Sequence, residues 1–171
     1  MVARAFEYLC MIGVYAPAYD AATASTDYGL PLISSEDVAD LNYSRCTVEQ
    51  VYTAIKQDLD DALPALLDKT PNTFRPAKNV AYGFLARMYL MHGEYDKALE
   101  NAKKALEAFI STVSNELAKG EKIALIGFGT FSINEKGERT GINPATKQQI
   151  TIPAKKVVKF KAGAELADKV K

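Results

Sequence analysis

The sequence predicts an α+β protein in which helices come first and a small sheet with a long β-hairpin follows. Apolar residues recur at helical spacing as far as Lys119-Gly120, where a cation and a C′ glycine end the last long helix. After this point the apolar residues alternate, which is typical of strands. Residues Ile142–Thr146 have the composition of a turn at the tip of a hairpin, and Gly163–Lys171 is expected to form a short closing helix.

Length and composition exclude several classes of protein. The 171 residues allow one domain or two small ones, and 48% hydrophobic with 25% charged residues excludes disorder throughout. No apolar run approaches the ~20 residues that span a bilayer. The N-terminus has no basic segment followed by an apolar one, so we expect no secretion signal and a cytoplasmic location. Cys10 and Cys46 are expected to be reduced thiols, and the single histidine excludes a multi-histidine metal site.

The first half is predicted to be helical. A helix is expected from Ala3 to about Tyr15, and residues 16–44 are expected to form a long loop. Thr47-Val48-Glu49-Gln50 is a capping box that starts the next helix, which Pro64 ends or kinks. The predicted apolar stripe of that helix contains Val48, Val51, Tyr52, Ile55, Leu59, Ala62 and Leu63.

Three carboxylates near the end of this second helix, those of Asp58, Asp60 and Asp61, are candidates for acid–base chemistry. No partner base lies near them in the sequence, so we interpret them as a solvated face. The histidine, His92, is expected at a helix end, where an imidazole suits the helix dipole, and we interpret it as structural. We expect no metal, no cofactor and no catalytic residue.

A third helix is expected to begin at Pro76, and it opens a helical hairpin. The pattern Tyr82-x-x-Leu85-Ala86-x-x-Tyr89-x-x-x-Gly93-x-Tyr95-x-x-Ala98 resembles one tetratricopeptide (TPR) repeat. The small alanines allow two helices to approach, and Gly93 makes the turn. Only this one repeat is evident, although a solenoid usually needs about three. If Asp96 caps the second helix of the pair, that helix runs for some 24 residues to about Lys119.

Several motifs in series give the first part a family resemblance. They are Arg4-Ala5-Phe6, Val14-Tyr15-Ala16-Pro17-Ala18-Tyr19-Asp20, Gly29-Leu30-Pro31-Leu32 and Ser44-Arg45-Cys46-Thr47-Val48-Glu49-Gln50-Val51-Tyr52. With the TPR-like repeat, residues 3–106 resemble the SusD/RagB family of outer-membrane glycan-binding lipoproteins. Members of that family are several times longer, and no glycan-binding residue of the family matches a position here. Aromatic residues of the predicted loop are either sugar-stacking groups or packing residues exposed by truncation; they are Tyr15, Tyr19, Tyr28 and Tyr43.

The C-terminal part is predicted to contain a three-stranded sheet. Ile123–Ile126 and Phe128–Ile133 form two short strands around a tight turn, and Gln149–Val158 returns from the hairpin tip. Pro153 requires an edge or a bulge at its position, because proline cannot donate a ladder hydrogen bond.

Residues 103–171 resemble the HU/IHF family of bacterial DNA-bending proteins. The motifs are Ala108-Phe109-Ile110, Gly120-Glu121-Lys122, Ile126-Gly127-Phe128-Gly129-Thr130-Phe131, Gly141-Ile142-Asn143-Pro144-Ala145-Thr146, Ile150-Thr151-Ile152-Pro153-Ala154-Lys155 and Phe160-Lys161-Ala162-Gly163. The resemblance implies a dimer core containing Phe128, Phe131 and Phe160, a hairpin arm that embraces DNA, and Pro144 as a wedge that kinks the duplex. Ile142 and Lys147 depart from the residues that are frequent in the family. Because the family's first helix is absent, we interpret the chain as a chimera, with a SusD-like fragment at 1–104 and an HU-like domain at 105–171.

The charges are unevenly distributed along the chain. Residues 1–104 hold 10 basic and 14 acidic residues, whereas residues 105–171 hold 11 and 7. This asymmetry favours a polyanionic partner for the C-terminal part. The residues predicted to contact double-stranded DNA are Lys136, Arg139, Asn143, Pro144, Lys147, Lys155, Lys156, Lys159 and Lys161.

The predicted function is non-enzymatic, sequence-tolerant DNA binding and bending by a homodimer. Two alternatives stay open: a glycan-binding fragment, and a folded chimera with neither activity.

Overall fold

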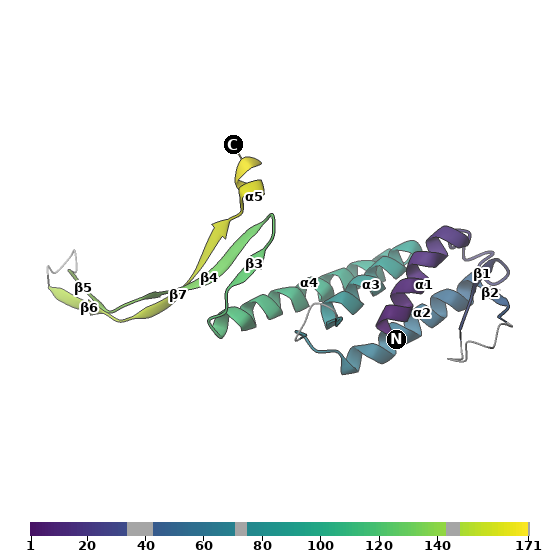
Figure 1. The fold of residues 1–171 in the computed structure, drawn as a ribbon, viewed down its shortest axis with the longest axis horizontal. Helices are drawn as coiled ribbons and strands as arrows, with labels where there is room; N and C mark the ends of the chain where they lie inside the picture. The colour runs from purple at the N-terminus through teal and green to yellow at the C-terminus, as the bar shows by residue number, and fades with distance from the viewer. Residues whose placement is uncertain (34–42, 71–74, 143–147, 171) are drawn as a thin grey trace. The chain divides into compact units, whose positions relative to one another are not determined.

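The computed structural model describes residues 1–33, 43–70, 75–142 and 148–170, and it has the α+β composition that the sequence predicts. Two compact units are present, Met1–Phe109 and Ile110–Lys171. The boundary between them lies inside the long helix α4 (Tyr95–Ala118), which contributes residues to both (Figure 1).

The first unit is built from helices α1 (Val2–Tyr15), α2 (Val48–Ala62), α3 (Lys78–Met91) and the beginning of α4. Leu9 and Ile12 of α1 and Ile55 and Leu59 of α2 are fully buried in one core. Helix α3 joins this core and also contacts α1, where the rings of Phe6 and Phe84 stack with their centroids 5.0 Å apart.

The predicted start of α2 is confirmed in atomic detail. The Thr47 hydroxyl accepts a hydrogen bond from the Gln50 amide at 3.2 Å, and the Thr47 amide donates to the Gln50 side chain at 2.9 Å. At the other end, Pro64 lies in the 3₁₀ turn η1 (Leu63–Ala65). The predicted start of α3 is wrong by two residues. Ala77 is the N-cap, so Pro76 precedes the helix instead of occupying its first turn.

The prediction of one long loop over residues 16–44 is wrong in its described part. Strand β1 (Tyr28–Pro31) pairs antiparallel with β2 (Arg45–Thr47). A Cβ atom on Gly29 would lie 2.7 Å from the Thr47 carbonyl oxygen, so glycine permits this close approach. The Arg45 Nε atom donates to the Gly29 carbonyl at 2.7 Å. Residues 34–42 of the predicted loop lie outside the described residues.

The interpretation of the three aspartates as a solvated face is wrong for one of them. Asp58 is 6% exposed and accepts two hydrogen bonds from Arg4 of α1, at 2.7 Å from Nε and 2.6 Å from Nη2. This carboxylate raises the pKa of Arg4 by hydrogen bonding and by charge. Asp60 and Asp61 are solvated as predicted, and each pairs within α2, with Lys56 and Gln57.

Helices α3 and α4 form the predicted hairpin. Gly93 makes the turn with φ of +79°, a left-handed conformation that favours glycine. His92 packs beside the turn, and its ring stacks on Tyr19 with a centroid distance of 3.6 Å. Helix α4 has the predicted 24 residues, but it begins at Tyr95, so Asp96 lies in its first turn and is not the cap. Gly120, with φ of +91°, follows its C-terminus as predicted.

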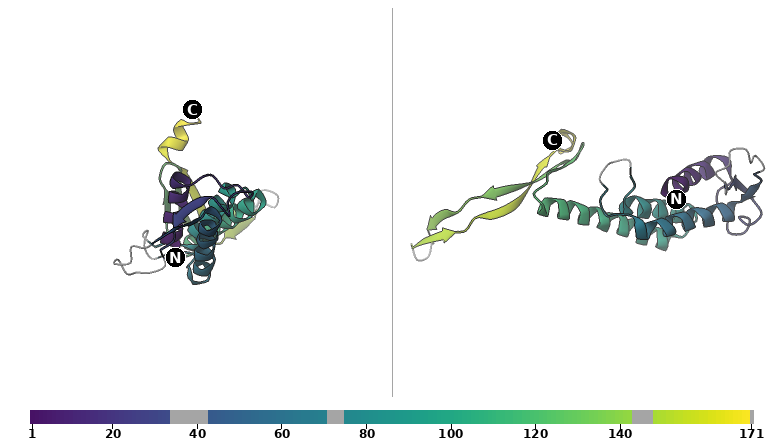
Figure 2. Two further views of the ribbon diagram at one scale, coloured as in Figure 1. Left: turned by 90° about the vertical axis from the view of Figure 1, so that its right-hand side faces the viewer. Right: turned by 60° about the horizontal axis from the view of Figure 1, so that its bottom comes forward.

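The second unit contains the predicted three-stranded sheet, with the order β3 (Ile123–Leu125), β4 (Gly129–Lys136) and β7 (Lys155–Ala162). Beyond it, β5 (Arg139–Ile142) pairs with β6 (Gln149–Ile152) and extends the β4–β7 hairpin into an arm (Figure 2). Helix α5 (Ala164–Asp168) closes the chain. Among the described residues, no helix is both long and apolar enough to cross a membrane.

Candidate nucleic-acid interface

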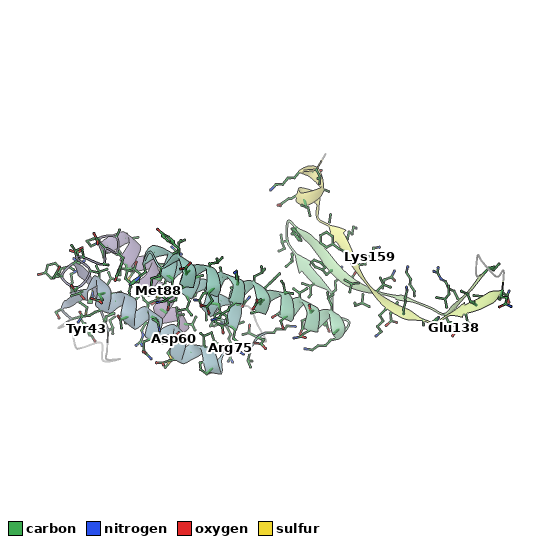
Figure 3. All side chains as sticks on the ribbon, turned by 180° about the vertical axis from the view of Figure 1, so that it is seen from behind. Tyr43, Asp60, Arg75, Met88, Glu138 and Lys159 are labelled. Carbon is green, nitrogen blue, oxygen red and sulfur yellow. The ribbon has the colours of Figure 1, made fainter. Side chains whose placement is uncertain are left out.

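One face of the β4–β7 pair carries most of the lysines that were predicted to contact DNA. Side chains alternate between the two faces of a strand, so the register of the pair decides which residues share a face. Lys136 lies opposite Lys155, Ser132 lies opposite Lys159, and Thr130 lies opposite Lys161. All four lysines are exposed. We call this surface the lysine face; Figure 3 labels Lys159 on it.

The lysine face has the dimensions of a surface that follows a polyanion. Lys155 and Lys161 are six residues apart on β7, which corresponds to about 20 Å at roughly 3.3 Å per residue. Duplex DNA carries one negative charge per about 1.7 Å of its axis, so several phosphates fit along such a row. Sequence reasoning missed Thr130, Ser132 and Asn134, whose hydrogen-bonding side chains share this face. Their alternation along β4 was the signal that identifies them.

The opposite face of the same strands is apolar. Phe131 lies opposite Phe160, with ring centroids 4.8 Å apart, and Phe128 lies 5.5 Å from Phe160. Ile133 and Val158 form the next pair along the ladder. The aromatic side chains that were predicted to form a dimer core therefore contact one another within one chain. They remain accessible, since Phe128 is 49% and Phe160 is 42% exposed.

Lys156 is separated from the other lysines by the register. It lies on the apolar side of the hairpin, directly opposite Glu135, and its Nζ atom is 3.1 Å from the Glu135 Oε1 atom. This pair follows Ile133 and Val158 and therefore forms the outer end of the apolar face. In the sequence Lys156 looks equivalent to the basic residues beside it, but the strand register places it on the opposite face of the hairpin from Lys155.

The arm continues beyond this pair after a gap in the ladder. Pairing stops at Lys136 and Lys155 and resumes at Arg139 and Ile152, so each strand skips two residues and the register is unchanged. Pro153 lies in this gap, on a two-stranded hairpin in which both strands are edges, as predicted for a residue without an N–H group. Arg139 is exposed at the base of the outer arm. The predicted contact residues Asn143, Pro144 and Lys147 lie outside the described residues.

The described residues contain no group of three or more His, Cys, Asp or Glu side chains that could hold a metal ion. Cys10 and Cys46 are both free thiols. The β4–β7 hairpin carries ammonium, hydroxyl and amide side chains on one face, and an apolar face that ends in the Lys156–Glu135 pair on the other. Such a surface can bind anions and apolar partners.

Comparison with known proteins relates the two parts of the chain to different families. A family model described as "Bacterial DNA-binding protein" matches residues 89–171, and one described as "Starch-binding associating with outer membrane" matches residues 1–90. The chain is 49% identical over 76 residues to DNA-binding protein HU of Staphylococcus aureus (strain COL), covering 44% of this chain and 84% of that protein.

Two solved structures are similar to parts of the chain. A SusD superfamily protein from Bacteroides thetaiotaomicron VPI-5482 matches with 29% identity and a TM-score of 0.54, covering 61% of this chain and 22% of that one. The chain therefore spans less than a quarter of that protein. An Anabaena HU–DNA cocrystal structure matches with 32% identity and a TM-score of 0.39, covering 52% of this chain and 95% of that one.

Proposed function

Because the chain is a chimera that belongs to the SusD-like family in its N-terminal part and to the HU family of bacterial DNA-binding proteins in its C-terminal part, we propose that it binds and bends double-stranded DNA without sequence preference and without catalysing a reaction. The HU-like part supplies the DNA-binding domain.

The observation that carries the proposal is the segregation of charge on the β4–β7 hairpin. Lys136, Lys155, Lys159 and Lys161 share one face, whereas the aromatic side chains share the other. Ammonium groups in a row neutralise phosphates, and phosphate contacts carry no sequence information. This arrangement supports sequence-tolerant binding in which the lysine face and the arm follow the duplex.

The apolar face supports a homodimer as the binding species. Phe128, Val158 and Phe160 leave a contiguous apolar surface on a small sheet, and surfaces of this kind mark protein–protein interfaces. A second copy of the chain offers the same surface, so a two-fold arrangement buries both. Two arms then extend from one dimer and embrace one duplex.

Bending is proposed on the basis of the arm. Apolar side chains of architectural proteins enter base steps and kink the duplex. Pro144 is the residue we propose as this wedge, and Arg139, Asn143 and Lys147 as its neighbours in contact with DNA. On the same reading, residues 1–104 form the SusD-like fragment, and residues 105–171 form the DNA-binding part.

The test is a salt series of DNA binding with matched lysine variants. Each phosphate contact contributes about 0.9 to the slope of log K against log salt. Lys159→Gln combined with Lys161→Gln should flatten the slope by about 2 per protomer, with little change in sequence preference. Lys103→Gln, an exposed lysine of the first unit, is the control and should leave the slope unchanged.

Absence of DNA binding at low salt by a dimeric protein would overturn the proposal. In that case the remaining alternatives are a glycan-binding fragment or a folded chimera with neither activity. A glycan array then separates these two alternatives, because only a glycan-binding fragment would bind to the immobilised glycans.

A further inference from the structure

In the first unit, helix α4 has an apolar row of side chains that the core does not use. Ala98 points into the core and is 9% exposed. By contrast, Tyr95, Leu99 and Leu106 are 70%, 57% and 58% exposed. Residues separated by steps of four, three and four positions lie along one side of a helix. We call this exposed row the α4 stripe; its members are Tyr95, Leu99, Ala102 and Leu106.

The α4 stripe is separate from the aromatic face of the sheet. It lies in the first compact unit, Met1–Phe109, whereas Phe128 and Phe160 lie in the second. Alternating steps of four and three residues are the spacing of a seam between two packed helices. Large apolar side chains that are more than half exposed along such a seam mark a surface for a partner helix.

The charged side chains beside the stripe indicate which helix this partner is. Lys104 pairs with Glu100 of its own helix, with the Nζ and Oε1 atoms 2.6 Å apart. Asp96 and Lys103 are exposed, and neither forms an ion pair with any residue that the structure describes. These two opposite charges are seven residues apart, so they flank the stripe on the same side, away from Ala98.

We propose that the α4 stripe binds the α4 stripe of a second copy of this chain, with the two helices antiparallel. When the two-fold axis passes beside Glu100, Leu99 packs against the partner's Ala102, a small residue that lets the helices approach. Asp96 then lies beside the partner's Lys103, and the two-fold axis produces this ion pair twice.

The direction of the pairing follows from the positions of the charges. In an antiparallel pair of helices, residues on the same side of the seam meet each other, so Asp96 meets Lys103. In a parallel pair, residues on opposite sides of the seam meet, and the residues on the opposite side are Ala98 and Ala105, which carry no charge. Flanking charges of this kind set the orientation of paired helices.

The size of the stripe makes this contact weaker than a standard protein interface. From Tyr95 to Leu106 the helix is about 18 Å long and roughly 10–12 Å wide, which gives a footprint of about 200 Å². A stable interface buries about 800 Å² per partner. We therefore expect pairing through α4 only above the tens of micromolar at which the sheet faces are proposed to pair. Two separate self-complementary faces then join dimers into larger assemblies, and neither contact requires DNA.

The experiment is a sedimentation-equilibrium series on the full-length Phe160→Asp variant, from tens of micromolar to the millimolar range. This background disables the sheet face, so the remaining association reports on the α4 stripe, and Leu99→Gln should remove it. Asp96→Lys and Lys103→Glu each turn both ion pairs into repulsion, and each should weaken the association about tenfold. The two substitutions together exchange the charges and should restore the association. Lys104→Glu is the matched control, because it makes the same charge change on the side of α4 away from the stripe, and it should have no effect.

Recovery in the double variant supports the pairing, because damage to the fold is not reversed by a second charge substitution. Thermal unfolding of each variant checks that the helices are intact. Absence of association in the millimolar range overturns the proposal, and so does a double variant that associates no better than the single ones, or an equal loss with Lys104→Glu. DNA binding at low protein concentration should be the same with either arrangement of the two charges. Loss of DNA binding therefore overturns the proposed function alone, and failure of the charge exchange overturns the α4 contact alone.

Discussion

Phe160 offers a direct test of the proposed dimer. Its ring lies at the centre of the aromatic cluster, 4.8 Å from Phe131 and 5.5 Å from Phe128, and 42% of its surface is accessible. Phe160→Asp places a charge in the middle of the face that two copies are proposed to share. Phe160→Leu is the matched variant, because it keeps an apolar side chain at the same position.

The exposed fractions give the size of the effect. Taking roughly 200 Å² for a phenylalanine side chain, the accessible parts of Phe128 and Phe160 together amount to about 180 Å². At about 25 cal/mol per Å² their burial is worth at most ~4.5 kcal/mol per protomer. The Phe160 share is about 2 kcal/mol, or about 4 kcal/mol for a symmetric dimer. Its loss should weaken dimerisation roughly a thousandfold, since 1.4 kcal/mol is a factor of ten.

Sedimentation equilibrium across a concentration series measures this change. We expect a dimeric mass for the parent chain at tens of micromolar, a monomeric mass for Phe160→Asp, and a dimer for Phe160→Leu. Thermal unfolding of the helical part, which lies in the other compact unit, controls for general damage. A monomeric parent chain, with Phe160→Asp leaving mass and stability unchanged, would refute the reasoning.

Four further predictions follow from the structure and the sequence. Pro144→Ala should retain DNA binding but reduce the bend, measured by fluorescence transfer between the DNA ends; an unchanged bend rejects the wedge. Thr47→Ala removes the cap of α2 and should lower the free energy of unfolding by about 1 kcal/mol in denaturant titrations, whereas Thr53→Ala within the same helix serves as the comparison. Arg4→Gln leaves the buried carboxylate of Asp58 without its bidentate partner and should lower the free energy of unfolding by about 2–3 kcal/mol in the same assay. An unchanged free energy of unfolding would contradict a stabilising role for the Arg4–Asp58 pair. Residues 1–104 alone should unfold cooperatively, and a non-cooperative melt shows that this part depends on the rest of the chain.

Local patterns were sufficient for most of the secondary structure. The capping box at Thr47 and Gln50, the turn at Gly93 and the helix end at Gly120 all form from residues that are close together in the chain. Interactions over three or four residues, or the left-handed conformation of a single glycine, are encoded in the sequence itself. The fold class and the length of α4 followed from the same kind of information.

Contacts between distant segments required the tertiary structure. Strand β1 exists because it pairs with β2, and its four residues have no periodicity that distinguishes them from a loop. Asp58 is buried because Arg4, 54 residues away, meets it across the α1–α2 interface. Neither the pairing partner nor the guanidinium lies near these residues in the sequence, so local reasoning assigned β1 to a loop and Asp58 to a solvated face.

In the candidate site, too, the composition could be read from the sequence, whereas the strand register required the tertiary structure. The sequence by itself determined that lysines are concentrated in the C-terminal hairpin and that aromatic residues accompany them. Only the pairing of β4 with β7 decided that Lys159 and Lys161 share a face with Lys136, while Lys156 lies on the other face against Glu135. The physical reason is that the side-chain period of a strand is two residues, so that the face of each side chain in a hairpin depends on which residues pair across it.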